Sequence, residues 1–262
     1  MRLVDAHCHF DFPAFDGRRY GVWERARRAG VERLVIPGVR RADWDRVIRV
    51  AAECDQWWCC LGIHPWFVGE HDQAAMDDLE RRLRQAETGC IAVGECGLDR
   101  LHGDLNSQMP WFEAQVDLAK SLDMPLVIHS VRTHDEVAAV LRRRRPDVPV
   151  LVHGFSGSYE QGRALVDLGC FLGIGGVITH DRARKTRDAV ARLPVDRMVL
   201  ETDAPDMAPA GVGKDRNEPA NLRQILTALA GLVGQPEVSL AAALTRNTGR
   251  LYRWSGYCGE AP

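Results

Sequence analysis

The feature that most constrains the fold is a regular alternation of short β-rich runs with longer amphipathic stretches. The runs are residues 3–8, 33–37, 57–62, 90–95, 125–129, 148–153, 170–175 and 198–202. Amphipathic stretches separate them at 20–29, 42–53, 73–87, 108–122, 135–144, 159–168 and 182–193, and two more follow at 219–232 and 239–245. This alternation predicts a parallel sheet covered by helices.

Eight such units predict a sheet that closes on itself. The runs are apolar almost throughout, which indicates strands buried on both faces. The length of 262 residues is close to the roughly 250 residues typical of a TIM barrel. An open doubly wound sheet is the alternative, but no GxGxxG motif follows the first run. We therefore expect an α/β fold, a single (β/α)₈ TIM barrel, with residues 1–262 forming one domain.

Composition and charge exclude several classes of protein. The formal net charge is −2, so the chain lacks the overall basic character of proteins that bind long nucleic acids. The first residues, MRLVDAHCHF, place polar Asp5 and His7 where a signal peptide has its apolar run. No stretch approaches the ~20 apolar residues of a membrane span. We expect a cytoplasmic protein with no membrane contact and no obligate protein partner.

The eight cysteines are interpreted as packing residues. The chain has neither a secretion signal nor paired CxxC motifs, and it is long enough to fold without disulfides. Free cysteine behaves as a small apolar side chain in strands. The residues concerned are Cys8, Cys54, Cys59, Cys60, Cys90, Cys96, Cys170 and Cys258.

Histidine or acidic residues stand at the ends of five of the β-rich runs. In a TIM barrel the carboxyl ends of all strands meet at one face, where the active site forms. Such groups are costly to bury unless they are paired or bind a metal, and accidental placement at five strand ends is improbable. The residues are His7, His9, Glu95, His129, His153 and Asp203.

These residue types predict two divalent metal ions. Imidazole and carboxylate together suit zinc, manganese or similar ions, magnesium included, and six ligands exceed the needs of one tetrahedral zinc. A glutamate can bridge two ions with its two oxygens. We place one ion at His7, His9, Glu95 and Asp203, and the other at Glu95, His129 and His153.

Two metals suggest hydrolysis, with Glu95 and Asp203 as the catalytic residues. Two ions ~3.5–4 Å apart can clamp the attacking and leaving oxygens of a displacement reaction. Asp203 can also take the proton of the attacking water, as a carboxylate near the nucleophile is a suitable general base.

Four further residues are candidates for supporting roles. His64 ends the third run and can hydrogen-bond a substrate phosphate, or it is a structural histidine before Pro65. Arg132 and Arg216 lie just past strand ends and can bind phosphate, with ordinary solvated charges as the equal alternative. Glu201 shares a strand face with Asp203 and can orient a metal-bound histidine.

Two aromatic residues and two basic runs have weaker signals. Trp66 and Phe67 follow the third run and could stack a nucleobase, but packing within the loop is at least as good an interpretation. Residues 142–145 are four arginines that end a helix, where cations are stabilised, so we interpret them as a solvated surface. Residues 181–187 follow the seventh run and could add a positive rim to the active face.

Seven segments in order resemble the TatD family of metal-dependent hydrolases, one group of the amidohydrolase-like TIM barrels. They are DAHCHFDFPAF, GIHPW, AVGECGLD, IHSVRTHDE, VHGFSGS, ETDAPDM and RNEPANL. The first segment and RTHD are particularly similar to a YjjV-like branch. The resemblance covers essentially the whole chain.

The resemblance implies a barrel with two divalent metals that acts on phosphodiesters. Members are associated with deoxyribonuclease activity, often 3′→5′ on single strands, and some relatives with deacylation of D-aminoacyl-tRNA. The family's ligands match the six positions above. Two departures put the substrate in doubt: Val131 stands where the family often has arginine, with Arg132 next, and Trp66-Phe67 differs from the usual pattern after GxHP.

Three functions follow as alternatives. The first is a deoxyribonuclease, a 3′→5′ exonuclease on single-stranded DNA; the near-neutral charge argues against binding a long duplex. The second is a metal-dependent esterase or deacylase acting on another ester, such as D-aminoacyl-tRNA. The third is an inactive metal-binding barrel, against which the intact Asp203 argues.

Overall fold

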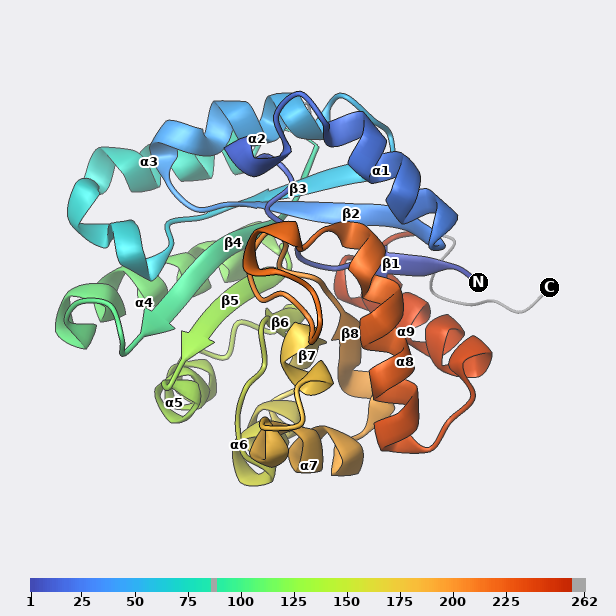
Figure 1. Ribbon diagram of the computed structural model, residues 1–262. Coiled ribbons are helices and arrows are strands. Elements are labelled where there is room, and N and C mark those ends of the chain that lie inside the picture. The colour runs from blue at the N-terminus through green and yellow to red at the C-terminus, as the bar shows by residue number, and fades with distance from the viewer. Residues whose placement is uncertain (86–88, 256–262) are drawn as a thin grey trace.

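The computed structural model describes residues 1–85 and 89–255. Within these residues eight parallel strands form one sheet, in the order of the chain from β1 to β8 (Figure 1). The strands are β1 Leu3–Asp5, β2 Val31–Gly38, β3 Trp57–Leu61, β4 Cys90–Asp99, β5 Leu126–Val131, β6 Val150–Val152, β7 Phe171–Ile174 and β8 Met198–Leu200. The predicted (β/α)₈ barrel is confirmed.

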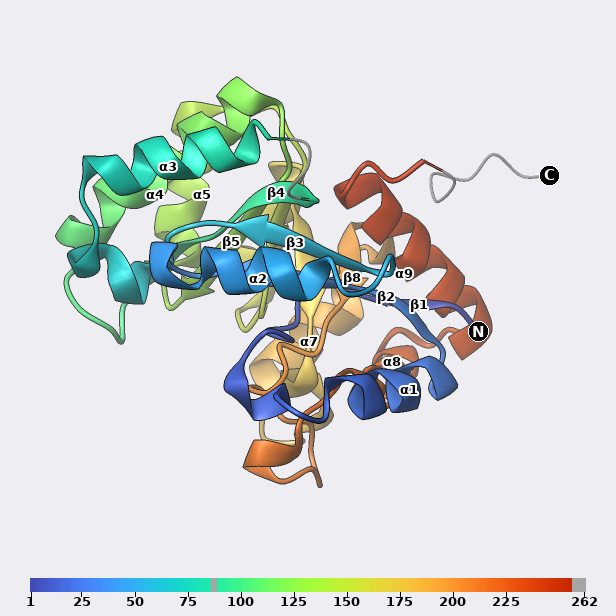
Figure 2. The same cartoon turned by 90° about the horizontal axis from the view of Figure 1, so that it is seen from above.

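Helices connect successive strands and surround the sheet on its outside, as Figures 1 and 2 show from two directions. They are α1 Arg19–Arg28, α2 Trp44–Ala51, α3 Gln73–Leu83, α4 Leu105–Leu122, α5 His134–Arg144, α6 Tyr159–Asp167, α7 Arg184–Arg192, α8 Leu222–Val233 and α9 Glu237–Leu251. Short 3₁₀ turns are η1 Pro13–Phe15, η2 Arg41–Asp43, η3 Pro65–Glu70, η5 Gly176–Thr179, η6 Val195–Arg197, η7 Lys214–Arg216 and η8 Pro219–Asn221.

Local sequence fixes where several helices begin. Ser158 caps α6: its Oγ accepts a hydrogen bond from the backbone N–H of Gln161 at 3.2 Å, and Gln161 Oε1 accepts one from the backbone N–H of Ser158 at 3.1 Å. This reciprocal capping box satisfies two donors that the first turn leaves free. Asp104 caps α4 in a simpler way, accepting from the backbone N–H of Asn106 at 3.1 Å.

The apolar core has two parts. The larger part lies between the strands and the helices. The smaller part fills the barrel and takes inward side chains from every strand: Val4, Val35, Cys60, Ala92, Val127, Leu151, Phe171 and Val199. Three residues from the end of α9 onward, Leu251, Tyr252 and Trp254, complete it. The Tyr252 hydroxyl donates to the carbonyl of Ala6 at 2.8 Å, so this segment is fixed to the chain just after β1.

The two edges of the sheet meet at a seam between β1 and β8. The seam also includes the residues that directly follow each of these strands. The backbone N–H of Ala6 donates to the carbonyl of Leu200 at 2.8 Å. Asp5 is fully buried and accepts two hydrogen bonds from Thr202, from its backbone N–H at 2.9 Å and from its hydroxyl at 2.5 Å. The seam therefore fixes the ends of β1 and β8 relative to each other.

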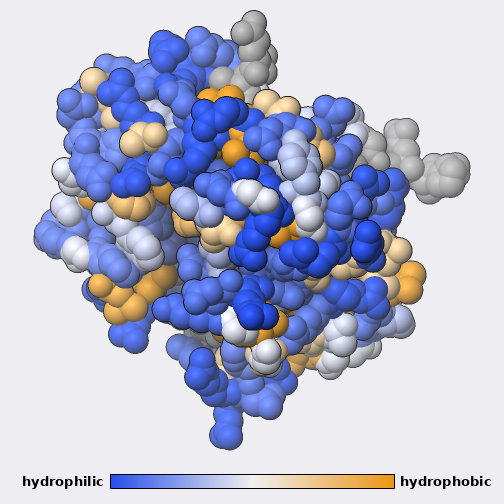
Figure 3. All heavy atoms as spheres, turned by 45° about the horizontal axis from the view of Figure 1, so that its top comes forward, coloured by the Kyte–Doolittle hydropathy of each residue, from blue (hydrophilic) through white to orange (hydrophobic). Residues whose placement is uncertain are grey.

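Polar side chains cover most of the face in Figure 3, where apolar residues form small, separate patches. No single helix in the described parts of the chain has the length and apolar content to cross a membrane. Among the described residues, the two helical segments Pro219–Val233 and Glu237–Leu251 reach the necessary length and apolar content only when they are taken together. The chain bends by 108° between them.

The cysteines mostly agree with the packing interpretation. Five are buried, namely Cys8, Cys59, Cys60, Cys96 and Cys170, whereas Cys54 and Cys90 are partly exposed. All seven are free thiols. Cys258 lies outside the described residues.

The closing role of α9 gives a first prediction. Leu251 is fully buried in the inner cluster, so Leu251→Ala should lower the free energy of unfolding by about 2–5 kcal/mol through the lost apolar contacts and the cavity left behind. Val238 lies on the same helix with 70% of its surface exposed, and Val238→Ala should change stability by less than about 0.5 kcal/mol. Urea unfolding measures both, and equal losses would contradict the assignment.

Candidate metal centre

The candidate ligands continue the inward face of the strands beyond the apolar cluster. His129 follows Val127 by two residues and His153 follows Leu151 by two, so each histidine points the same way as the apolar residue before it. His7 and His9 come directly after β1, and Glu95 lies within β4. All six predicted ligands consequently gather at the carboxyl ends of the strands, the face where TIM barrels place active sites.

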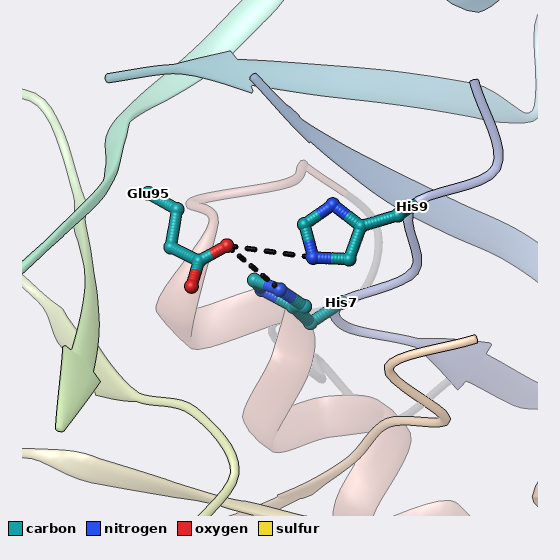
Figure 4. A group of neighbouring side chains, drawn as sticks. All are labelled: His7, His9 and Glu95. Atoms are coloured by element: carbon teal, nitrogen blue, oxygen red, sulfur yellow. Dashed lines mark ion pairs between the residues drawn. The ribbon is translucent and has the colours of Figure 1, made fainter. Parts of the chain in front are cut away.

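One oxygen of Glu95 belongs to a first group of ligand atoms (Figure 4). Glu95 Oε2 lies 3.3 Å from His7 Nε2 and 3.5 Å from His9 Nε2. Asp203 Oδ1 lies 3.5 Å from each of the same two nitrogens. The seam fixes this group, because the backbone N–H of Asp203 donates to the carbonyl of His7 at 2.9 Å.

The other oxygen of Glu95 belongs to a second group. Glu95 Oε1 lies 3.1 Å from His129 Nδ1 and 2.8 Å from His153 Nε2, and these two nitrogens are 3.2 Å apart. His64 Nε2 lies 3.3 Å from the same oxygen. The carboxylate of Glu95 is thus shared between two sets of histidines.

Both groups fit a divalent cation. Four ligands 2.0–2.1 Å from a tetrahedral zinc are about 3.3–3.4 Å from one another, and adjacent octahedral ligands at 2.0–2.1 Å from Mg²⁺ are about 2.8–3.0 Å apart. The separations given above span 2.8–3.5 Å. His7 Nε2 and Glu95 Oε2 are buried and have no hydrogen-bond partner among the described residues. A cation between them would satisfy both atoms.

Burial and neighbouring charges set the protonation states of the first group so that its atoms can bind a cation. Burial lowers the pKa of His7 to about 4 and that of His9 to about 3, so both rings are neutral at pH 7 and can offer a lone pair. Burial alone would raise the pKa of Glu95, but His153, His64 and His7 around it hold that pKa well below its usual range. Glu95 therefore stays ionised.

Asp203 and Glu201 have raised pKa values, in contrast to Glu95. Burial raises the pKa of Asp203 well above its usual range, and the charges of Glu95 and Glu201 raise it further. Burial also raises the pKa of Glu201. Three carboxyl groups at one end of the barrel repel one another, which a bound cation would relieve. Asp203 also has a φ of 53°, in the left-handed region that aspartate tolerates better than most residues.

Asp99 is a residue of the centre that the sequence analysis missed. Its Oδ2 accepts hydrogen bonds from His129 Nε2 at 3.1 Å and from Trp66 Nε1 at 2.6 Å. A proton on Nε2 leaves the Nδ1 lone pair of His129 facing the second group, as in other metal sites where a carboxylate orients a histidine. Period-two spacing could have indicated Asp99, which lies four residues after Glu95 on the same strand.

His129 also couples cation binding to proton release. Burial alone would lower its pKa, but Asp99 and Glu95 raise it to about 9. At pH 7 a cation must therefore displace a proton from this ring, so affinity for the metal rises with pH.

The other predicted site residues lie at different distances from the centre. His64 faces it, and its Nδ1 accepts the backbone N–H of Trp66 at 3.2 Å, which leaves its proton on Nε2. Glu201 Oε1 is 4.0 Å from His153 Nδ1, too far for a direct hydrogen bond. Its carboxylate occupies the space that a side chain at Gly173 would need. Arg132 and Arg216 are exposed on the loops after β5 and β8, and within the described residues neither guanidinium contacts a candidate ligand.

The two basic runs lie in different parts of the barrel. Arg143 and Arg144, at the end of α5, pair with Glu113 on α4, away from the centre. The loops after β7 and β8 line an open pocket of about 380 Å³. Arg182 and Lys214 line it together with the apolar side chains of Val177 and Met207.

Comparison with known proteins identifies the family. The sequence profile described as "TatD related DNase" matches residues 4–253. The chain belongs to the TatD family. It is 39% identical over 254 residues to the "uncharacterized metal-dependent hydrolase YjjV" of Escherichia coli K12, covering 96% of this chain and 98% of that one. The crystal structure of this E. coli protein superposes with a TM-score of 0.92 over the same shares.

A further relative carries a more specific name. The "3′-5′ ssDNA/RNA exonuclease TatD" of Pantoea ananatis is 33% identical over 260 residues, covering 95% of this chain and 99% of its own. Together with the candidate ligand groups, these relatives make the chain a metal-dependent hydrolase of the TatD family, as the sequence predicted.

The position of Asp99 gives a second prediction. Asp99→Asn should weaken binding of a divalent cation by about 10–100-fold, because His129 loses the charged acceptor that orients its ring. Titration calorimetry of the chelator-treated protein with Zn²⁺ measures the change. Asp181→Asn is the control, as its carboxylate is fully exposed on the same face. An affinity for Asp99→Asn within twofold of the unmutated protein would show that Asp99 does not position the ligand.

Proposed function

We propose that the chain is an exonuclease that removes nucleotides from the 3′ end of single-stranded DNA with the help of two divalent metal ions. The observation that carries this proposal is the position of Glu95, whose two oxygens face separate histidine groups. Such an arrangement suits a carboxylate that bridges two cations. Two-metal centres of this kind are a recurrent solution for displacement at phosphorus.

The cations are zinc, manganese or magnesium. Bound at the two groups, they supply Lewis acidity to the scissile phosphate and a water nucleophile at neutral pH. We assign His7, His9, Glu95 and Asp203 to one ion, and Glu95, His129 and His153 to the other. The matching separations of the ligand atoms support this assignment.

Asp203 is the general base in this proposal. It lies at the edge of the first group, with Oδ1 3.5 Å from His7 Nε2 and from His9 Nε2, where a carboxylate next to the attacking water is a suitable general base. His64 carries its proton on the nitrogen that faces the centre, so it can donate to a phosphate oxygen. Glu201 accepts a hydrogen bond from the backbone N–H of Gly154, the residue after His153, and so can help to position that histidine.

Charge and surroundings favour a short segment of single strand. A net charge of −2 does not suit a long duplex, but Arg132, Arg216, Arg182 and Lys214 follow strand ends around the centre and can contact a few phosphates. The name of the P. ananatis relative, which specifies single-stranded DNA and RNA, supports the same class of substrate.

A cleavage assay tests the nuclease proposal and the role of Asp203 together. The metal-reconstituted protein should shorten end-labelled single-stranded DNA from its 3′ end. Asp203→Asn should keep the fold and slow cleavage by at least about a hundredfold, the usual loss on removing a general base. Asp215→Asn, an exposed carboxylate in the same loop, should cleave normally. Absence of cleavage with zinc, manganese and magnesium would refute the nuclease, and D-aminoacyl-tRNA would be the next substrate.

Elemental analysis tests the bridging role of Glu95. The reconstituted protein should hold two cations per chain after dialysis. Glu95→Ala should lose both, because each group then lacks the oxygen that the Glu95 carboxylate supplies to it. Glu160→Ala, an exposed carboxylate at the start of α6, should retain two. Retention of two cations by Glu95→Ala would rule out a bridge.

A further inference from the structure

Trp66 presents an indole ring to solvent at the rim of the candidate metal centre. It lies in η3, two residues after His64, and 49% of its surface is exposed. Trp57 and Trp44 are 3% and 0% exposed and serve as core, whereas Trp58 and Trp111 are only partly buried. The exposed ring of Trp66 does not contribute to the core in this way.

The ring of Trp66 is nevertheless held firmly in place. Its Nε1 donates to Asp99 Oδ2 at 2.6 Å, and the same oxygen accepts from His129 Nε2. The ring of His64 meets it edge-on, with 5.0 Å between ring centroids and 89° between planes. His64 and His129 both face Glu95 Oε1. Trp66 is therefore fixed to the second ligand group through its polar edge.

A second exposed ring packs against the face of the first. His102 comes from the loop after β4, and its ring centroid lies 4.2 Å from that of Trp66 with 31° between planes. Its Nδ1 is 3.3 Å from Asp99 Oδ2, and 53% of its side chain is exposed. One buried carboxylate thus holds two neighbouring aromatic rings and a candidate metal ligand.

We propose that Trp66 and His102 form a platform on which one unpaired nucleobase of the substrate stacks, next to the phosphate at the metal centre; this inference rests on the proposed nuclease function. Every base has an aromatic face, so such a platform binds bases of any sequence. In a duplex both faces of an internal base are covered by its neighbours. The platform therefore makes the centre selective for single strands.

Loop packing is the alternative, and the exposure of both rings argues against it. A ring that serves packing covers apolar neighbours, whereas Trp66 has the rings of three histidines and the carboxylate of Asp99 around it and leaves half its surface in water. An indole with a fixed polar edge and an accessible surface can bind a flat ligand with little loss of side-chain entropy.

Binding of base-deleted oligonucleotides tests the platform. A short, labelled single strand is prepared with its bases intact and with one abasic residue at each position in turn. Binding is measured by fluorescence anisotropy with reconstituted protein carrying Asp203→Asn, which prevents turnover. We expect one abasic position to weaken binding roughly tenfold, the usual effect of losing one stacked base. Adding Trp66→Ala should abolish that position-specific effect.

Two further variants separate stacking from structural damage. Trp66→Phe loses the hydrogen bond to Asp99 but keeps an aromatic ring, and we expect it to retain most of the position-specific effect. Leu101→Ala removes an apolar side chain that is 57% exposed in the same loop as His102, and we expect the effect to persist in full. Loss of the effect in Trp66→Phe would mean that Trp66 acts through Asp99 and not by stacking.

The outcomes distinguish this inference from the proposed function. Suppose that the Asp203→Asn protein binds the strand and that base removal weakens this binding equally with and without Trp66. The platform is then wrong, even if the unmutated protein cleaves DNA. If the position-specific effect depends on Trp66 but no cleavage occurs, the platform stands and the exonuclease activity is wrong. Failure to bind any strand overturns the platform.

Discussion

The seam between β1 and β8 is the constraint on which the metal centre depends. Asp5 is buried there at a cost, since burial raises its pKa to about 7 even though hydrogen bonds from Thr202 and His7 oppose that rise. Those bonds, with the one from Asp203 N–H to the His7 carbonyl, fix the strand ends that carry the first ligand group. The same hydrogen bonds therefore close the barrel and hold the first ligand group in place.

The charges at the centre are arranged around one carboxylate. Glu95 stays ionised because histidines surround it, and most of those histidines stay neutral because they are buried. Asp99 adds a second ionised carboxylate behind His129, where hydrogen bonds from His129 and Trp66 hold its pKa well below its usual range against the effect of burial. A cation entering the centre thus meets the ionised carboxylate of Glu95 and the neutral imidazoles of His7 and His9, and it displaces a proton from His129.

The sequence predicted the fold and the gathering of the candidate ligands, because strand alternation and strand ends are properties of local pattern. It missed Asp99 because Gly97 interrupts the apolar run, so the fourth strand was expected to end at Glu95, whereas β4 continues to Asp99. The link from Trp66 to Asp99 joins η3 to the last residue of β4 and has no sequence signal. Arg132 and Arg216 remain candidates, since long exposed side chains take their positions from a substrate.

The seam also sets the order in which the protein matures in the cell. Asp5 and Thr202 are 197 residues apart in the chain, and Leu251, Tyr252 and Trp254 complete the inner cluster from beyond β8. Contacts so distant in sequence cannot form before both segments have been synthesised. A nascent chain therefore emerges from the ribosome with its first two histidines long before their partners exist, and the capture of metal is a step that follows translation.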